Sequence, residues 1–240
     1  MATDTTARRS YGQPCPVAHA LDLVGDRWTL LIVRDLMFGP VRFTDLRAGL
    51  PGVAPNLLSD RLRRLVGEGL VEKVDLPPPA DRTVYALTPR GRELAPVVHA
   101  LARFGVEAWE DPDGDPPPRR LLRGAPLALM APERLGAAAW TVMIELPDGS
   151  VHLTVRPRGA DGPRESGRES DGALGRLRLA DPPPPGAPPP DLVVVTTLGT
   201  LVDLTRGRLT PAAARRADRL TTEGADRVLE QFARLFGWSG

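Results

Sequence analysis

A lone cysteine, Cys15, is the first residue of this sequence whose side chain could do chemistry, and His19 follows it one helical turn later. Pro16 suits the first position of a helix, so we expect Cys15 at the N-cap, where the helix dipole and free N–H groups favour a thiolate. One cysteine cannot close an internal disulfide. Oxidation would give a mixed disulfide, a higher oxide or a bridge between two copies of the chain. Cys15 is therefore a candidate redox-sensing residue, and a buried packing role is the alternative.

Catalysis and metal binding are not indicated by the rest of the sequence. The three histidines, His19, His99 and His152, stand far apart, and with a single cysteine they offer no metal-ligand spacing. The sequence contains no GxSxG, no phosphate-binding loop and no HExxH. One Cys–His pair at the entry to a helix is a weak basis for an enzyme. We therefore expect a binding protein with no catalytic residue, no metal and no cofactor.

A second group of candidates lies in residues 51–70, PGVAPNLLSDRLRRLVGEGL. Apolar residues recur there at spacings of three and four, which predicts an amphipathic helix that starts near Pro55 and buries Leu58, Leu62, Leu65 and Val66. The opposite face could bind DNA, because Asn and Arg can each make paired hydrogen bonds to a purine edge. Residues 42–92 hold nine basic and six acidic side chains, a local charge of +3 that permits a phosphate partner. The candidates are Asn56, Ser59, Asp60 and Arg63, with Arg61 and Arg64 as further ones.

The elements around this helix have the order of a winged helix-turn-helix. Apolar spacing predicts helices over residues 15–24 and 27–37, with Asp26 as the N-cap of the second and Trp28 in the core, and a short helix over RFTDLRAGL. Farther on, LVEKVDL and RTVYAL alternate as strands of a hairpin around PPPAD, whose tip would bring Arg82 to phosphate or to the minor groove. Thr88 then predicts the start of one long final helix. In this fold the first turns of the polar-faced helix enter the major groove.

Three segments of this region resemble the HxlR-type winged helix-turn-helix regulators of bacteria, in order and spacing over about residues 10–110: CPVAHALDLVGDRWTLLIVRDLMFGPVRFTDL, LSDRLRRLVGEGLVEK and VYALTPRGREL. The resemblance implies a homodimer that binds a two-fold operator in double-stranded DNA. Some members of that family use a cysteine at the position of Cys15 to sense oxidants or electrophiles. Groove contacts are implied at Pro55, Asn56, Ser59, Asp60 and Arg63, with a wing contact at Arg82. The implied dimer surface comes from the first and last helices, with Val17, Leu21, Val97, Leu101 and Phe104.

Asp60 has two roles open to it in that setting. As an acceptor it could read the amino group of a cytosine. Alternatively, it could hold a neighbouring arginine in place. The sequence does not choose between these roles.

A different pattern follows a linker at residues 111–124. The segments WTVMIEL, VHLTVRP, ALGRLRLAD and DLVVVTT predict an antiparallel sheet, and the residues after them predict two short helices, a strand and an amphipathic terminal helix. Strands followed by helices indicate an α+β domain. Residues 125–238 resemble sterol-carrier-protein-2-like domains, in which a helix with a Gly-containing turn precedes an Ala-rich helix, a strand, a turn and a closing helix.

That second resemblance implies an apolar pocket between sheet and helices for a lipid-like or acyl ligand. The alternative is a filled core that serves as an oligomerisation or spacer domain, because hydrophobic residues at helical spacing can face either one another or a guest. The candidate lining comprises Met143, Leu198, Leu201, Leu204, Val228, Phe232 and Phe236.

The sequence therefore predicts an α+β protein with a winged helix DNA-binding and dimerisation domain at residues 10–110 and a ligand-binding domain at residues 125–240. The expected function is that of a homodimeric, sequence-specific transcriptional regulator whose second domain senses an apolar or acyl ligand. The rival hypothesis is a lipid or acyl carrier that keeps a degenerate winged helix as a dimerisation module. No apolar run is long enough to cross a bilayer and the N-terminus has no secretory signal, so we expect a soluble, cytoplasmic protein.

Overall fold

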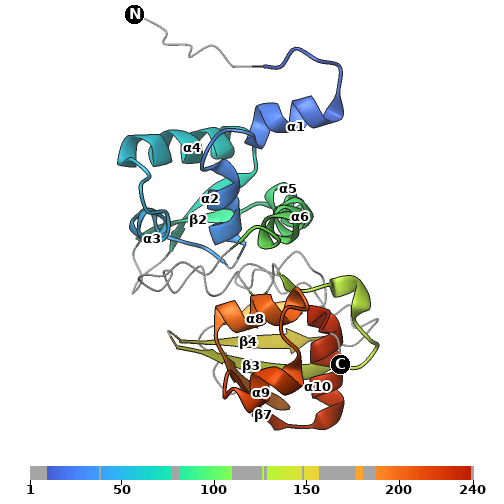
Figure 1. Ribbon diagram of the computed structural model, residues 1–240. Helices are drawn as coiled ribbons and strands as arrows, with labels where there is room; N and C mark the ends of the chain where they lie inside the picture. Colours follow the sequence, from blue (N-terminus) through green and yellow to red (C-terminus); the bar gives the residue numbers. More distant parts are fainter. Residues whose placement is uncertain are drawn as a thin grey trace, which may run out of the picture.

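The two sequence patterns fold into two units, which Figure 1 shows one above the other. The computed structural model describes residues 10–37, 39–76, 82–109, 126, 129–147, 149–156, 177–180 and 188–238. Helices predominate in the first unit, whereas the second is built on a five-stranded sheet. The predicted linker at residues 111–124 lies outside the described residues, so the domain boundaries stay predictions.

Four helices open the first unit: α1 (Pro16–Val24), α2 (Thr29–Leu36), α3 (Phe43–Gly49) and α4 (Pro55–Gly67). Their apolar stripes meet in one core, in which Ile32, Leu46 and Leu58 are fully buried. Cys15 occupies the N-cap position of α1, as predicted, with Pro16 as the first helical residue. No side chain caps that helix end.

A hairpin and two helices complete the first unit. Strands β1 (Val71–Leu76) and β2 (Arg82–Leu87) pair antiparallel, with Val71 opposite Leu87. They are followed by α5 (Pro89–Arg92) and α6 (Ala95–Val106). The order of elements is that of the predicted winged helix-turn-helix.

The final helix of this unit is not continuous, contrary to the prediction. Thr88 caps α5 by accepting a hydrogen bond from the Gly91 N–H, as its sequence position suggested. The chain then turns, and α6 starts with Leu94 as its N-cap. Pro96 explains the break, because a proline inside a helix lacks an N–H donor and its ring collides with the carbonyl four residues earlier. Pro96 is tolerated in the first turn of a new helix instead.

Two further expectations for this unit were wrong. Asp26 does not cap α2; Trp28 holds the N-cap position, in the left-handed region with φ of 78°, and packs half-buried against the core. The carboxylate of Asp26 is directed instead to arginines of α4. Val66 is 39% exposed rather than buried, because the α4 residues that face the core are Leu58, Leu62 and Leu65.

The second unit contains a short 3-10 helix, η1 (Pro132–Arg134), and the hairpin of β3 (Trp140–Leu146) and β4 (Gly149–Val155). Strands β5 (Leu177–Ala180) and β6 (Leu192–Thr196) follow. The remaining elements are α8 (Leu198–Thr205), α9 (Pro211–Arg216), β7 (Leu220–Gly224) and α10 (Asp226–Phe236). The predicted sequence of two short helices, a strand and a terminal helix is thus present.

The sheet has the strand order β5-β4-β3-β6-β7 and is mixed. Strands β3 and β6 are parallel, with Val142 beside Leu192, while the other neighbours are antiparallel. The prediction of a purely antiparallel sheet was therefore wrong at this pair. Strands β3 and β6 are separated in the sequence by β4 and β5, so no tight hairpin joins them, and parallel pairing needs such a longer connection.

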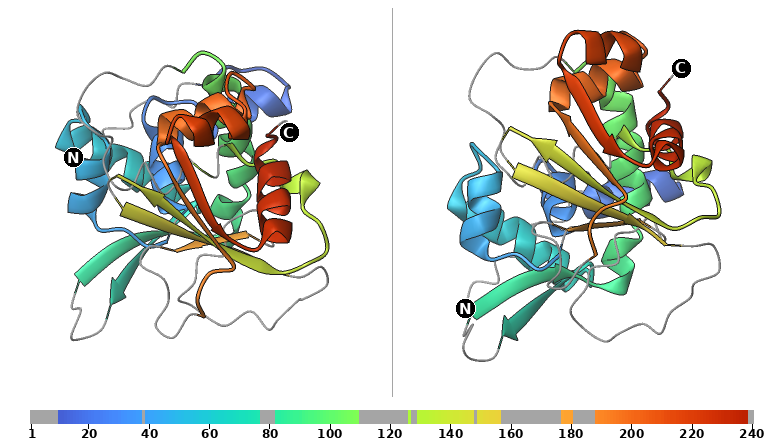
Figure 2. Two further views of the ribbon diagram at one scale, coloured as in Figure 1. Left: turned by 60° about the horizontal axis from the view of Figure 1, so that its bottom comes forward. Right: turned by 90° about the horizontal axis from the view of Figure 1, so that it is seen from below.

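One face of this sheet carries the core of the second unit. Along β3 the buried residues Trp140, Val142, Ile144 and Leu146 alternate with half-buried ones. Helices α8, α9 and α10 lie on one side of the sheet, as Figure 1 and the two views of Figure 2 show. Aromatic side chains of α10 pack in this core, and the ring centroids of Phe232 and Phe236 are 4.6 Å apart. No helix in the described ranges combines the length and apolarity that a membrane span needs.

Candidate nucleic-acid interface

The exposed start of α4 is the first component of the candidate interface. Ala54 is the N-cap and Pro55 the first helical residue, where its missing N–H costs nothing. The Asn56 side-chain oxygen accepts a hydrogen bond from the Leu57 N–H at 2.9 Å, so one of the free N–H groups of the helix end is satisfied. Asn56 is exposed, and its NH2 group donates to none of the described residues. It is therefore available to a base edge.

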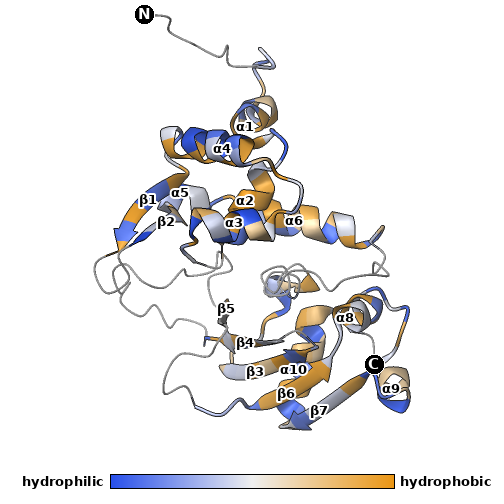
Figure 3. Ribbon diagram, turned by 90° about the vertical axis from the view of Figure 1, so that its left-hand side faces the viewer, coloured by the Kyte–Doolittle hydropathy of each residue, from blue (hydrophilic) through white to orange (hydrophobic). Residues whose placement is uncertain are grey.

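A polar stripe continues along α4 from Asn56 through Ser59, Asp60 and Arg63, at helical spacing on the face away from the buried leucines. Figure 3 shows the contrast between hydrophobic and hydrophilic residues along this helix. The Arg63 side chain is 76% exposed and its Nη1 lies 2.8 Å from Asp60 Oδ1. Of the two roles open to Asp60, the structure thus contains the contact with a neighbouring arginine. Contact of this stripe with DNA stays a prediction.

Arg61 and Arg64, the two further candidates, are held by acceptors in and before the loop between α1 and α2, and a contact of theirs with DNA stays a prediction. Arg64 donates to the carboxylate of Asp26 and to the backbone oxygen of Asp22. Arg61 Nη1 lies 3.6 Å from the same Asp26 carboxylate, and its Nε donates to the Arg27 oxygen. These two arginines fasten α4 to the loop between α1 and α2. They position the helix rather than extend its exposed surface.

The β1–β2 hairpin, or wing, is joined by backbone hydrogen bonds to the segment before α3. Val41, before α3, exchanges two backbone hydrogen bonds with Tyr85 of β2. Arg82 is exposed at the first position of β2, opposite Leu76, which is the last described residue of β1. The tip itself, residues 77–81, lies outside the described residues. The contact of Arg82 with phosphate or the minor groove stays a prediction.

The other basic residues of this region divide into two groups. Arg42, Arg90 and Arg92 bind acceptors of the chain: the Asp45 carboxylate and the backbone oxygens of residues 68 and 87. The hydrogen bond that Arg42 donates to Asp45, and then the negative charge of Asp45, raise the pKa of Arg42. By contrast, Arg47 of α3 and Lys73 of β1 are exposed and bind no acceptor among the described residues. Sequence reasoning missed these two cations, although the basic excess of residues 42–92 pointed to them.

Comparisons with known proteins agree with this architecture. The family model of the HxlR-like helix-turn-helix matches residues 23–113. An uncharacterized HTH-type transcriptional regulator of Mycobacterium tuberculosis is 40% identical over 116 residues, which are 48% of this chain and 72% of the relative. The chain belongs to the HxlR-like helix-turn-helix family.

Other relatives of this HxlR-like chain include the uncharacterized HTH-type transcriptional regulator YvaP of Bacillus subtilis. It is 37% identical over 104 residues, which are 43% of this chain and 95% of YvaP. Among solved structures, the reduced form of the transcriptional regulator YodB from B. subtilis is 32% identical, covers 42% of this chain and all of that chain, and has a TM-score of 0.36. The family match ends at residue 113, so it does not test the resemblance of residues 125–238 to sterol-carrier-protein-2-like domains.

The surface implied for dimerisation in HxlR-type regulators is apolar and exposed here. Val17 and Leu21 stand one turn apart on α1 and are 67% and 42% exposed. Val97, Leu101 and Phe104 form a stripe along α6, and Phe104 is 83% exposed. Exposed apolar stripes at helical spacing mark surfaces that a second chain can cover.

Cys15 of this HxlR-like chain is half-buried at the start of α1, while His19 one turn later is exposed. The two residues are joined by the helical hydrogen bond from the His19 N–H to the Cys15 oxygen. A redox role of the thiol stays a prediction.

None of the side chains predicted to line an apolar pocket lines the polar cavity described below, and an apolar pocket at those residues stays a prediction. Met143 lies on the face of the sheet opposite the core, because buried and half-buried residues alternate along β3. Leu198 lies half-buried at the edge of the core. The others are closed into the packed interior of the second unit: Leu201, Leu204, Val228, Phe232 and Phe236. The described cavity lies beyond α8 and has a polar lining that sequence reasoning missed. The sequence did contain an indication of this cavity, because Gly199, Val202, Asp203 and Arg206 are spaced so that they share one helix face.

Proposed function

We propose that this protein is a sequence-specific DNA-binding transcriptional regulator that acts as a homodimer. The observation that carries the proposal is the exposed polar stripe of α4, which begins at the free helix end and lies opposite a fully apolar face. Such a stripe suits the major groove, where Asn56 and Arg63 can each address a purine edge. Pro55, Ser59 and Asp60 lie within reach of the same groove, and Arg82 of the wing serves the adjacent backbone.

Homodimerisation is proposed on the exposed apolar stripes of α1 and α6. Two copies related by a two-fold axis would present two α4 helices to successive major grooves, so the operator should have two half-sites about one helical turn apart or a multiple of it. The relatives' membership of the HTH class supports the same assignment.

The C-terminal unit is proposed to regulate DNA binding in response to a small molecule. Its element order follows the sterol-carrier-like pattern, with Gly207 after α8, the Ala-rich α9, β7 and the closing α10. Val106 and Trp109, at the end of α6, pack against the core of this unit, which offers a path from a ligand to the proposed dimer helix. An apolar or acyl ligand within that core would have to open it, since the residues there are packed closed.

The deciding experiment is fluorescence anisotropy of the full chain with duplexes of about 30 base pairs that tile the region upstream of its own gene. We expect one duplex to bind at least about 1,000-fold more tightly than a scrambled one. Its affinity should fall steeply with salt, with a log–log slope near −0.9 for each phosphate contacted. If no duplex is preferred and the affinity does not change with salt concentration, the proposed regulation is refuted and the hypothesis of a lipid or acyl carrier is favoured.

A further inference from the structure

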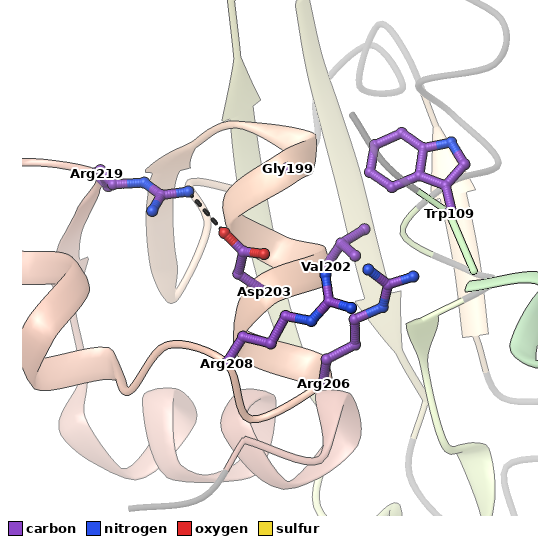
Figure 4. Close-up of a pocket in the computed structure, with 7 residues that line it drawn as sticks. All are labelled: Trp109, Gly199, Val202, Asp203, Arg206, Arg208 and Arg219. Carbon is purple, nitrogen blue, oxygen red and sulfur yellow. Dashed lines mark hydrogen bonds and ion pairs between the residues drawn. The ribbon is translucent and has the colours of Figure 1, made fainter. Parts of the chain in front are cut away.

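A cavity of about 280 Å³ opens between the end of α6 and the outer face of α8. Figure 4 shows its lining, with Trp109 on one side and the side chains of α8 and the following turn on the other. The lining residues are Trp109, Gly199, Val202, Asp203, Arg206, Arg208 and Arg219. None of them belongs to the predicted apolar pocket, so this is a separate site.

The local sequence dictates this arrangement. Gly199, Val202, Asp203 and Arg206 recur at spacings of three and four, which places them on one face of α8. The helix ends at Thr205, and Gly207 two residues later has a φ of 68°. The Arg208 N–H donates to the backbone oxygen of Asp203 at 2.9 Å. This Gly-terminated turn reverses the chain. Arg206 and Arg208 thus reach the same cavity from either side of Gly207.

The cavity is strongly positive. Three guanidinium groups stand against the single carboxylate of Asp203, which leaves a lining charge of +2. Arg219 is already engaged, since its Nη2 lies 2.9 Å from Asp203 Oδ2 and its Nε donates to Thr200. Arg206 and Arg208 are therefore the two cations that no carboxylate among the described residues neutralises.

Arg206 carries the strongest sign of a missing partner. Its Nε and Nη2 atoms are both buried, and neither makes a hydrogen bond within the described part of the chain. Buried N–H groups are almost always paired, and a buried charge without a partner is unfavourable. Figure 4 shows this guanidinium directed to the side on which Trp109 lies. Two donors of one guanidinium edge match the two oxygens of a carboxylate.

The rest of the lining selects the remainder of the ligand. Trp109 presents an aromatic ring and Val202 an apolar surface that is 4% exposed. The volume of about 280 Å³ lies at the lower end of ligand pockets, so it suits one or two fused rings rather than a long acyl chain. We propose that this cavity binds a small planar carboxylate, with the anion on Arg206 and Arg208 and the ring system against Trp109.

The position of the cavity gives this ligand a means to act on DNA binding, and this part rests on the proposed function. Trp109 lies three residues beyond the end of α6, the helix of the proposed dimer surface, whereas the arginines belong to the C-terminal unit. A ligand that contacts both would favour one arrangement of the two units. Linkage then requires that operator and ligand alter each other's affinity by the same factor.

The test is calorimetric titration of the full chain, without DNA, with 2-naphthoate, benzoate, 2-naphthamide and octanoate. We expect 2-naphthoate to bind with a Kd of about 1 mM or below and to quench tryptophan fluorescence. Arg206→Gln and Arg208→Gln should each weaken it about tenfold or more, and Trp109→Leu should remove the quenching. Arg216→Gln, an exposed arginine of α9 outside the cavity, is the matched control and should change nothing. Equal binding of the neutral amide, preference for octanoate, or full affinity of Arg206→Gln would overturn the proposal.

Two further readouts separate this proposal from the proposed function. Without ligand, Arg206→Gln should leave Tm unchanged or raise it by about 2–4 °C, because it removes an unpaired buried charge. A fall in Tm with unaltered naphthoate binding would make Arg206 a structural residue and refute the site. Failure of operator binding with intact naphthoate binding would refute regulation alone, since the calorimetry uses no DNA.

Discussion

The carboxylate of Asp26 accepts a hydrogen bond from Arg64 across 38 positions of the sequence and so joins the loop before α2 to the last turn of α4. Arg61 approaches the same carboxylate. The helix that carries the candidate groove contacts is therefore oriented by two of its own arginines, while Arg63 between them stays at the surface.

Asp26→Ala should destabilise the fold. It leaves Arg61 and Arg64 without their carboxylate, and because both sides of the contact are about one-third exposed we expect the free energy of unfolding to fall by about 1 kcal/mol. Urea denaturation measures this change. Glu72→Ala, which removes an exposed carboxylate of β1, is the control and should alter stability by less than about 0.5 kcal/mol. Equal stability of the two variants would show that this contact does not hold α4.

Arg63→Ala should weaken operator binding while leaving the stability of the fold almost unchanged. Its side chain is 76% exposed, so the free energy of unfolding should change by less than about 0.5 kcal/mol. Operator binding should weaken by about 1–3 kcal/mol if the guanidinium reads a base. Anisotropy with the operator measures the loss, with Arg216→Ala as the surface control. Unchanged affinity would remove Arg63 from the groove contacts.

Asp60→Asn tests the two roles of that carboxylate. The ion pair of 2.8 Å with Arg63 leads us to expect that its loss frees the arginine and raises affinity for all duplexes, because a negative charge near the phosphates is removed. A set of operators with single base-pair changes measures this. A loss of about 1–3 kcal/mol confined to one G·C position would instead show that Asp60 reads a cytosine.

Phe104→Glu should dissociate the proposed dimer. Phe104 is the most exposed of the large apolar side chains described, and aromatic anchors of interfaces commonly contribute 2 kcal/mol or more, so the dimer Kd should rise about 30-fold or more. Light scattering during size-exclusion chromatography gives the oligomeric state. Val195→Glu, at a 42% exposed position of β6, introduces the same charge away from α6 and should leave the dimer intact. A dimer that survives Phe104→Glu would place the interface elsewhere.

Cys15→Ser tests the candidate redox role. If the thiol senses oxidants, treatment with diamide or peroxide should change operator affinity of the wild type and leave the serine variant unaffected, because no other cysteine exists in the chain. Mass spectrometry of the treated protein identifies the product. The same response in both proteins would assign Cys15 to packing.

Local sequence patterns sufficed for most elements of both units, though not for the break between α5 and α6. The leucines at positions 58, 62 and 65 could form only one continuous stripe on a helix, so the buried face of α4 followed directly from their spacing, and so did the exposure of Asn56 and Arg63 opposite them. Pro89 after Thr88 likewise marked the start of α5. The stripes of α1 and α6 are proposed for dimerisation through the family resemblance, since periodicity alone does not tell a core face from an interface.

Only the tertiary structure decided which partners the side chains beside those buried faces contact. Arg61, Arg63 and Arg64 are the same residue type within one turn, and only the arrival of Asp26 from another loop separates the two that orient α4 from the one that is exposed. In the same way, β6 pairs parallel with β3, and Trp109 lines the same cavity as Arg206, although these residues lie far apart in the sequence. Periodicity reports the direction of a side chain relative to its own helix axis, whereas its partner depends on how separate elements pack.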